Sequence, residues 1–233
     1  MKKIIIFNQW FCKPLPNWLD KFIDRVLANP NLNFCCITDQ KHPESQERIN
    51  FFDEKIKDYV LKVQKLTGEL ISDKSGGIAS VDLRPLISCA YPNLVEDYEF
   101  WGWCDLDIVI GNISSFINQS ILDKWDIFTT RRNPIEESIY GAFTIVRNCE
   151  EINQLWRDDQ FIKTIKEPFV GAIAKSWSPI AFKKQAENKI KIWCKDVEGK
   201  NPRFVGDKLL DENKKELLYH HFRPKPKIWP EKC

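Results

Sequence analysis

Residues 100–111 have the sequence FWGWCDLDIVIG, which is the most informative stretch of the chain. Asp105 and Asp107 interrupt an otherwise apolar and aromatic run. Residues two apart in a strand point to the same face, so both carboxylates would meet at one point if the stretch stays extended. Two carboxylates beside Trp101 and Trp103 repel each other, and a divalent cation such as Mg²⁺ or Mn²⁺ would remove that conflict. The alternative is that the strand ends before the pair and the two aspartates cap a surface turn.

Strand and helix patterns alternate on the amino-terminal side of this stretch. Continuous apolar runs predict buried strands at 4–7, 34–38 and 49–52, and an aromatic strand at 99–104. Helical spacing predicts a helix at 18–27 with Asn17 as its N-cap and another at 56–66 that is closed by Gly68. A further helix is expected to begin near Asp82, with Pro85 in its first turn.

This order of elements indicates βαβ units and a mainly parallel α/β sheet flanked by helices. Ligands of such sheets bind beyond the carboxyl ends of the strands, where Asn8, Asp39 and Asp105 fall. The second half is less regular, with strands expected at 127–129 and 142–146, a helix at 150–156 and a closing strand at 217–222. The absence of repeats and linkers predicts one domain over 1–233, with a nucleotide-binding half, 1–112, and an acceptor-side half, 113–233.

Composition narrows the class of protein. The chain has 233 residues, 43 % hydrophobic and 29 % charged, which is typical of a soluble globular protein. A net charge of +2 argues against a nucleic-acid partner. The basic tail at 223–227 is either solvated or in contact with phosphates or anionic lipid at the inner face of the plasma membrane.

The chain shows neither a signal peptide nor a run of transmembrane length, so a cytoplasmic location is expected. Eight cysteines without metal-site spacing suit that reducing compartment, and Cys35, Cys36 and Cys104 are predicted to be small buried hydrophobes.

The stretch 100–111 closely resembles the DxD segment of small bacterial glycosyltransferase-like proteins that have a GT-A fold and are encoded with surface-polysaccharide genes. Four other segments resemble parts of that family in the same order: LPNW at 15–18, VDLRP at 81–85, GAFTIVRN at 141–148 and LYHHF at 218–222. The similarity covers residues 3 to about 150 well and the carboxyl terminus in patches.

The resemblance implies a Mn²⁺- or Mg²⁺-dependent transfer of a sugar from a nucleoside diphosphate, with a UDP-sugar favoured, to a saccharide or lipid-linked saccharide. It also implies roles by position. Asp107 would bind the metal, Asp105 the metal or the ribose, and His221 would complete the metal or pyrophosphate contacts. His221 could instead edge the core, and His220 could take its role.

The donor contacts are carried over in the same way. Asn8 and Asp39 would line the nucleoside pocket, although Asp39 could be only a turn residue. Asp82 and Arg84 would face the donor, with Arg84 as a phosphate or sugar ligand; the alternatives are a helix N-cap and an ordinary helix-surface arginine. Trp101 is also expected to contact the donor, because Trp commonly stacks on sugars. The alternative is a plain core residue.

Two departures from the family bear on catalysis. Many members have His where this chain has Ala142, and an acidic pair where this chain has Lys183 and Lys184 after Phe182. An inverting enzyme needs a carboxylate base, and the missing acid therefore favours retention. The candidate bases that remain are Glu136, Glu137, Asp158 and Asp159. The rival functions are a nucleotide-sugar-binding module without activity and a metal-dependent nucleotide-diphosphate hydrolase.

Overall fold

The computed structural model describes residues 3–71, 79–130, 139, 141–167, 171–195 and 202–221. Its centre is a seven-stranded sheet with the order β3-β2-β1-β4-β7-β6-β8. The strands are β1 (Ile4–Trp10), β2 (Leu32–Thr38), β3 (Ile49–Asp53), β4 (Phe100–Cys104), β6 (Ile127–Thr130), β7 (Phe143–Arg147) and β8 (Ile192–Lys195). The sheet is mostly parallel, and β7 runs antiparallel to both of its neighbours. The predicted single-domain α/β fold is therefore confirmed.

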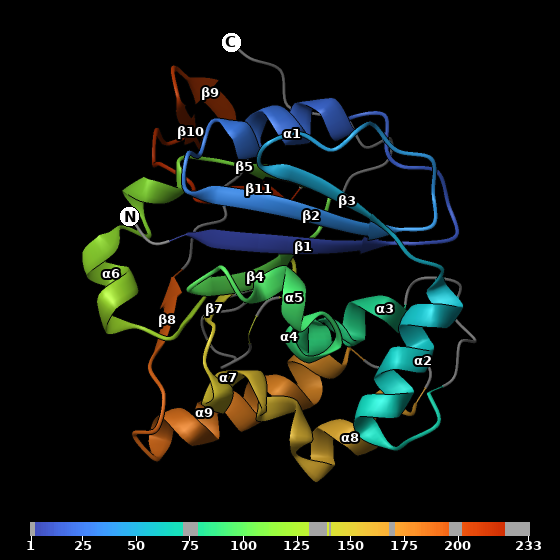
Figure 1. The fold of residues 1–233 in the computed structure, drawn as a ribbon. Helices are drawn as coiled ribbons and strands as arrows, with labels where there is room; N and C mark the ends of the chain where they lie inside the picture. The colour runs from blue at the N-terminus through green and yellow to red at the C-terminus, as the bar shows by residue number, and fades with distance from the viewer. Residues whose placement is uncertain are drawn as a thin grey trace.

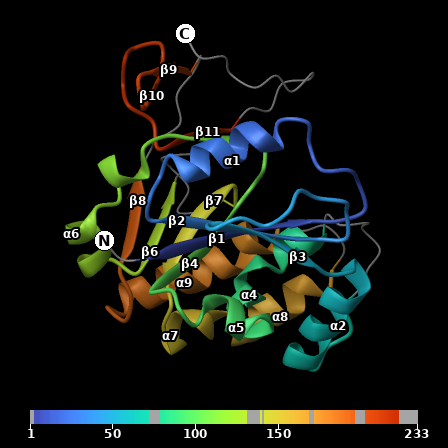
Figure 2. The same cartoon turned by 45° about the horizontal axis from the view of Figure 1, so that its top comes forward.

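Helices cover both faces of the sheet (Figure 1). One face carries α1 (Leu19–Leu27) together with the two-stranded sheets of β5 (Ile108–Ile110) with β11 (Tyr219–His221) and of β9 (Arg203–Val205) with β10 (Lys208–Leu210). Figure 2 also shows β9, β10 and β11 on the α1 side. The other face carries α2 (Ile56–Thr67), α3 (Ala79–Asp82), α4 (Ile87–Ala90), α5 (Pro92–Val95), α7 (Glu150–Asn153), α8 (Asp159–Ile165) and α9 (Ser178–Ala186), while α6 (Gln119–Lys124) lies at the side.

Each face of the sheet has its own hydrophobic core, which explains the continuous apolar runs of the strands. Along β1, Ile4 and Ile6 pack on the α1 side, and Ile5 and Phe7 pack under the helices of the other face. Strands buried on both faces lose the alternation of apolar and polar residues. None of the helices in the described ranges is long and apolar enough to cross a membrane.

The structure confirms most of the predicted elements in the first half and corrects two helix starts. α2 ends at Gly68 in a left-handed conformation, as predicted. α1 begins at Leu19 with Trp18 at the N-cap position, so the assignment of Asn17 as N-cap is wrong. Asp82 ends α3 rather than beginning a helix, and Pro85 instead lies in a 3-10 turn, Arg84–Leu86, that leads into α4.

Two boundaries differ from the predicted ones. β1 continues past Phe7 to Trp10, since Asn8 and Gln9 are buried and hydrogen-bonded inside the fold. The helix expected at 150–156 is α7 followed by a 3-10 turn, Leu155–Arg157. The glycines at 76–77, the candidate bases Glu136 and Glu137, and the basic tail at 223–227 lie outside the described residues.

Candidate metal centre

The aspartate pair lies in a turn between two strands rather than on an extended strand. β4 ends at Cys104, Leu106 and Asp107 form a turn, and β5 begins at Ile108. Neighbouring groups fix this turn from two sides: the Asp105 N–H donates to the carbonyl of Ala142 at 2.9 Å, and Trp18 Nε1 donates to the carbonyl of Leu106 at 2.8 Å. The strand therefore ends before the pair, as in the second of the two alternatives, yet the two carboxylates still converge.

A histidine from the end of the described chain completes this group. β11 pairs antiparallel with β5 and places His221 opposite Ile108, the residue that follows Asp107. His221 Nε2 is 3.1 Å from Asp107 Oδ1 and 4.0 Å from Asp105 Oδ2. One ligand atom from each of Asp105, Asp107 and His221 lies within 4.8 Å of the others.

This arrangement has the chemistry of a divalent metal site. Two carboxylates and an imidazole could bind a divalent cation and leave positions for waters or for phosphate oxygens of a substrate. The three side chains are 27 %, 17 % and 10 % exposed, respectively, so an ion could reach them while much of each ligand is shielded from water.

His220 does not share this position. Successive strand residues face opposite sides, and β11 puts His220 opposite Val109, on the face away from His221 and Tyr219. Tyr219 is fully buried and packs against Phe143 with 5.6 Å between ring centroids. The register of this short strand therefore brings His221, and not His220, to the aspartates.

Arg84 is buried directly behind the pair. Its guanidinium donates to Asp105 Oδ1 at 2.7 Å, to the carbonyl of Gly141 at 2.6 Å and to that of Cys104 at 3.4 Å. Its side chain is only 2 % exposed. The interpretation of Arg84 as an ordinary helix-surface residue is wrong, because it forms a buried ion pair with the motif.

Asn8 is buried and supports the turn from β1. Its Nδ2 donates to the Cys104 carbonyl at 2.7 Å, and its Oδ1 has no hydrogen-bond partner within the described parts of the chain.

Burial raises the pKa of the Cys104 thiol, an effect that nearby Arg84 partly opposes. Cys104 is therefore a neutral buried thiol, as predicted for the cysteines of the strands.

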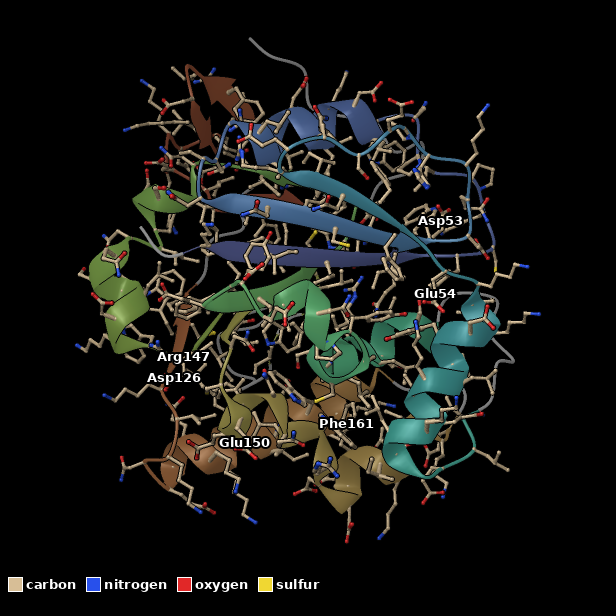
Figure 3. All side chains as sticks on the ribbon, in the orientation of Figure 1. Asp53, Glu54, Asp126, Arg147, Glu150 and Phe161 are labelled. Carbon is tan, nitrogen blue, oxygen red and sulfur yellow. The ribbon has the colours of Figure 1, made fainter. Side chains whose placement is uncertain are left out.

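Asp39 lies in a cleft at the carboxyl ends of β2 and β3. The cleft has a volume of about 620 Å³ and is lined by Thr38, Asp39, Asp53, Glu54 and the first residues of α2. Asp39 accepts a hydrogen bond from the Cys12 N–H at 3.1 Å, which ties the cleft to the loop after β1. Figure 3 shows Asp53 and Glu54 at one end of the sheet and the Asp126–Arg147 ion pair at the other.

Two predicted donor contacts are engaged elsewhere. Trp101 is 1 % exposed, and its Nε1 donates to Asn153 Oδ1 at 2.8 Å, so its ring is a core residue without a face for a sugar. The Asp82 carboxylate accepts hydrogen bonds from the backbone N–H groups of Gly171 and Ala172 at 3.2 and 2.6 Å. Asp82 therefore holds the start of the π-helical turn Ile173–Trp177.

The two candidate bases in the described part of the chain, Asp158 and Asp159, lie at the start of α8. Asp158 caps α8 by accepting from the Gln160 N–H at 2.9 Å, and Asp159 is the first residue of that helix. Lys183 and Lys184 lie in the last turn of α9, whose chain enters β8 at the amino end of that strand. Lys183 and Lys184, which stand where the family has an acidic pair, thus lie toward the amino ends of the parallel strands, whereas the metal centre follows the carboxyl end of β4.

Sequence reasoning missed the contacts that support the centre. The Arg84–Asp105 ion pair, the Trp18–Leu106 hydrogen bond and the bond from Gln9 Nε2 to Tyr59 Oη at 2.7 Å join residues distant in sequence. The one available signal was the presence of Asn8 and Gln9 directly after an apolar strand, where buried polar groups need partners.

Comparisons with known proteins agree with the fold. The model of a family of unknown function (DUF6625) matches residues 6–220. No match was found among curated protein sequences. Among solved structures, a glycosyltransferase involved in the glycosylation of the major capsid of PBCV-1 is similar in fold, with a TM-score of 0.51, 14 % identity, and 97 % of this chain and 95 % of that one covered.

Proposed function

The chain belongs to the DUF6625 family, and we propose that it is a divalent-metal-dependent glycosyltransferase that uses a nucleoside-diphosphate sugar. The observation that carries the proposal is the convergence of Asp105, Asp107 and His221 at the end of β4. A crevice at the carboxyl ends of parallel strands is where ligands of such sheets bind. The similar fold of a glycosyltransferase supports the reaction class.

The metal centre would handle the diphosphate of the donor. Asp107 and His221 would hold the cation with one oxygen of Asp105, and Mn²⁺ or Mg²⁺ would offset the negative charge that grows on the leaving diphosphate. The three side chains are partly exposed, so phosphate oxygens could complete the coordination shell.

The cleft beside β2 would hold the nucleoside. Carboxylates are good acceptors for ribose hydroxyls and base N–H groups, so Asp39 and Asp53 suit the uncharged end of a nucleotide, while Glu54 is held by Lys62. Asn8 would support the turn from beneath rather than contact the base, because it is 2 % exposed. A UDP-sugar donor and an acceptor from bacterial surface-polysaccharide synthesis are the substrates that the family resemblance favours.

Titration of the purified chain with UDP- and GDP-sugars in Mn²⁺, Mg²⁺ and chelator tests this function. We expect calorimetric binding of one donor only with metal, and transfer to a saccharide acceptor detected by mass spectrometry. Asp107→Asn should abolish both. Asp97→Asn is the matched control, since it removes the same charge from an exposed residue before β4.

The outcomes separate the rival functions. Equal donor affinity in chelator would refute metal dependence. Release of free sugar without any glycoside product would indicate a hydrolase, and metal-dependent binding without turnover would indicate a binding module.

A further inference from the structure

The two aspartates of the metal centre differ in what lies behind them. Asp107 is paired with His221, with 3.1 Å between Asp107 Oδ1 and His221 Nε2. Asp105 is paired through Oδ1 with Arg84, and its Oδ2 faces His221 at 4.0 Å. The two oxygens of Asp105 therefore serve different partners: one is held from inside the fold, and the other is directed to the site.

Arg84 and Asp105 belong to one closed hydrogen-bonded unit. The Asp105 N–H donates to the Ala142 carbonyl, and the Arg84 guanidinium donates to the adjacent Gly141 carbonyl and to Asp105 Oδ1. The same guanidinium also reaches the carbonyl of Cys104, the last residue of β4. Arg84 thus ties the motif to the start of β7 and fixes the carboxylate in one orientation.

We propose that Arg84 is a positioning residue, which orients Asp105 for the metal and does not itself contact the donor. The inference rests on the proposed metal-dependent function. Its geometric basis is burial: the Arg84 side chain is 2 % exposed and lies behind the 27 % exposed side chain of Asp105. A planar guanidinium that binds a carboxylate and two carbonyls at once fixes geometry in a way that a flexible ammonium does not.

This proposal makes the two aspartates unequal. A buried guanidinium needs a countercharge, and Asp105 forms an ion pair with it. Loss of Asp105 would therefore leave the buried Arg84 charge without this carboxylate, whereas loss of Asp107 would leave the Arg84–Asp105 ion pair in place. Residues behind a metal ligand commonly change metal affinity by about 10- to 100-fold when they are replaced.

Electron paramagnetic resonance titrations of the full chain with Mn²⁺ alone test the proposal. The proteins are wild type, Arg84→Met, Arg84→Lys, Asp105→Asn and the double variant Arg84→Met with Asp105→Asn. We expect about 10- to 100-fold weaker Mn²⁺ binding in Arg84→Met, in line with such residues elsewhere. Arg84→Lys should fall between it and wild type. The double variant should bind like Asp105→Asn alone, because Arg84 acts through Asp105.

Three results would overturn the positioning role. One is that Arg84→Met lowers the Mn²⁺ affinity by the same factor in the Asp105→Asn background as in wild type. Another is unchanged Mn²⁺ affinity with weakened donor affinity, which would make Arg84 a donor ligand. If Arg84→Met does not fold, Arg84→Lys decides, and wild-type Mn²⁺ affinity in that folded variant would refute the proposal.

A stability measurement keeps this test separate from the proposed function. If wild type binds no Mn²⁺, the metal-dependent function fails. Melting temperatures of the same single and double variants in chelator then report whether Arg84 and Asp105 are coupled. Losses of melting temperature that are not additive support the pairing, and additive losses refute it.

Discussion

At the scale of single residues, two adjacent histidines offer an internal control for the metal centre. His221 Nε2 is 3.1 Å from Asp107 Oδ1, whereas His220 points to the other face of β11. Both have similar burial and the same chemistry, so they differ mainly in direction. A role that depends on direction should distinguish them.

We expect His221→Ala to weaken Mn²⁺ binding by at least tenfold, while His220→Ala leaves it within about twofold of wild type. The physical reason is the loss of a first-sphere imidazole in one variant only. Calorimetry with Mn²⁺ in the absence of donor measures it. Loss in His220→Ala with wild-type binding in His221→Ala would shift the assignment by one residue, and no change in either would remove β11 from the site.

The residues that form this centre could be predicted from the sequence, but their geometry could not. Asp105 and Asp107 stood out because carboxylates interrupt an apolar run, and His221 followed from a family resemblance. The turn at Leu106 was one of two alternatives that the residues left open, and the contacts with Trp18 and Ala142 that fix it come from other parts of the chain. The burial of Arg84 was missed for the same reason, since it comes from tertiary packing alone.

At the scale of elements, the predictions succeeded where burial alone decides the pattern. The runs of β1, β2 and β4 are apolar on both faces, and α2 has a clear apolar stripe and a left-handed Gly68 at its end. They failed at Asp82, which ends α3 instead of capping a new helix. Asp82 caps a backbone segment about ninety residues later, a partner that no local pattern reveals.

The β5–β11 pair is the element that brings His221 to the aspartates, and it depends on a close backbone approach at Gly111. A Cβ at this position would lie 2.3 Å from the Leu217 carbonyl oxygen and 3.1 Å from that of Leu218. The Gly111 N–H also donates to the Leu218 carbonyl at 2.8 Å. Any side chain here must displace the segment that leads into β11.

We therefore expect Gly111→Ala to lower the free energy of unfolding by about 1–3 kcal/mol, the usual cost of overpacking. It should also weaken Mn²⁺ binding, because His221 follows the displaced segment. Urea unfolding and Mn²⁺ calorimetry measure the two effects. Val205→Ala, an exposed residue of the neighbouring β9, is the control and should change neither. Wild-type Mn²⁺ affinity in a destabilised Gly111→Ala would show that β11 is not needed for the metal.

At the scale of the whole molecule, the metal centre joins the middle of the chain, at residues 105–107, to the last described strand. β1 and β4 lie at the centre of the sheet, while β11 is formed by residues 219–221 and packs on the α1 side. Leu217, Leu218 and Tyr219 are buried in the same core cluster as Ile4 and Phe22. A cation held by Asp107 and His221 would therefore fasten the last described strand to the body of the sheet.

This arrangement predicts that Mn²⁺ stabilises the folded chain by mass action. A ligand that binds only the native state adds about 2.7 kcal/mol when its free concentration is a hundredfold above Kd. For a chain of this size, each kcal/mol raises the melting temperature by roughly 2–4 °C. We expect a rise of that order in wild type and in Asp97→Asn, and none in Asp107→Asn.

Differential scanning calorimetry with and without Mn²⁺ measures the shift, and native-state hydrogen exchange locates it. Because the cation would bridge the turn before β5 and the end of β11, the amides of this pair should gain the most protection. A shift of equal size in Asp107→Asn would place the stabilising ion elsewhere. Protection that spreads evenly over the sheet, without a maximum at β5 and β11, would contradict a bridge between the turn at residues 105–107 and β11.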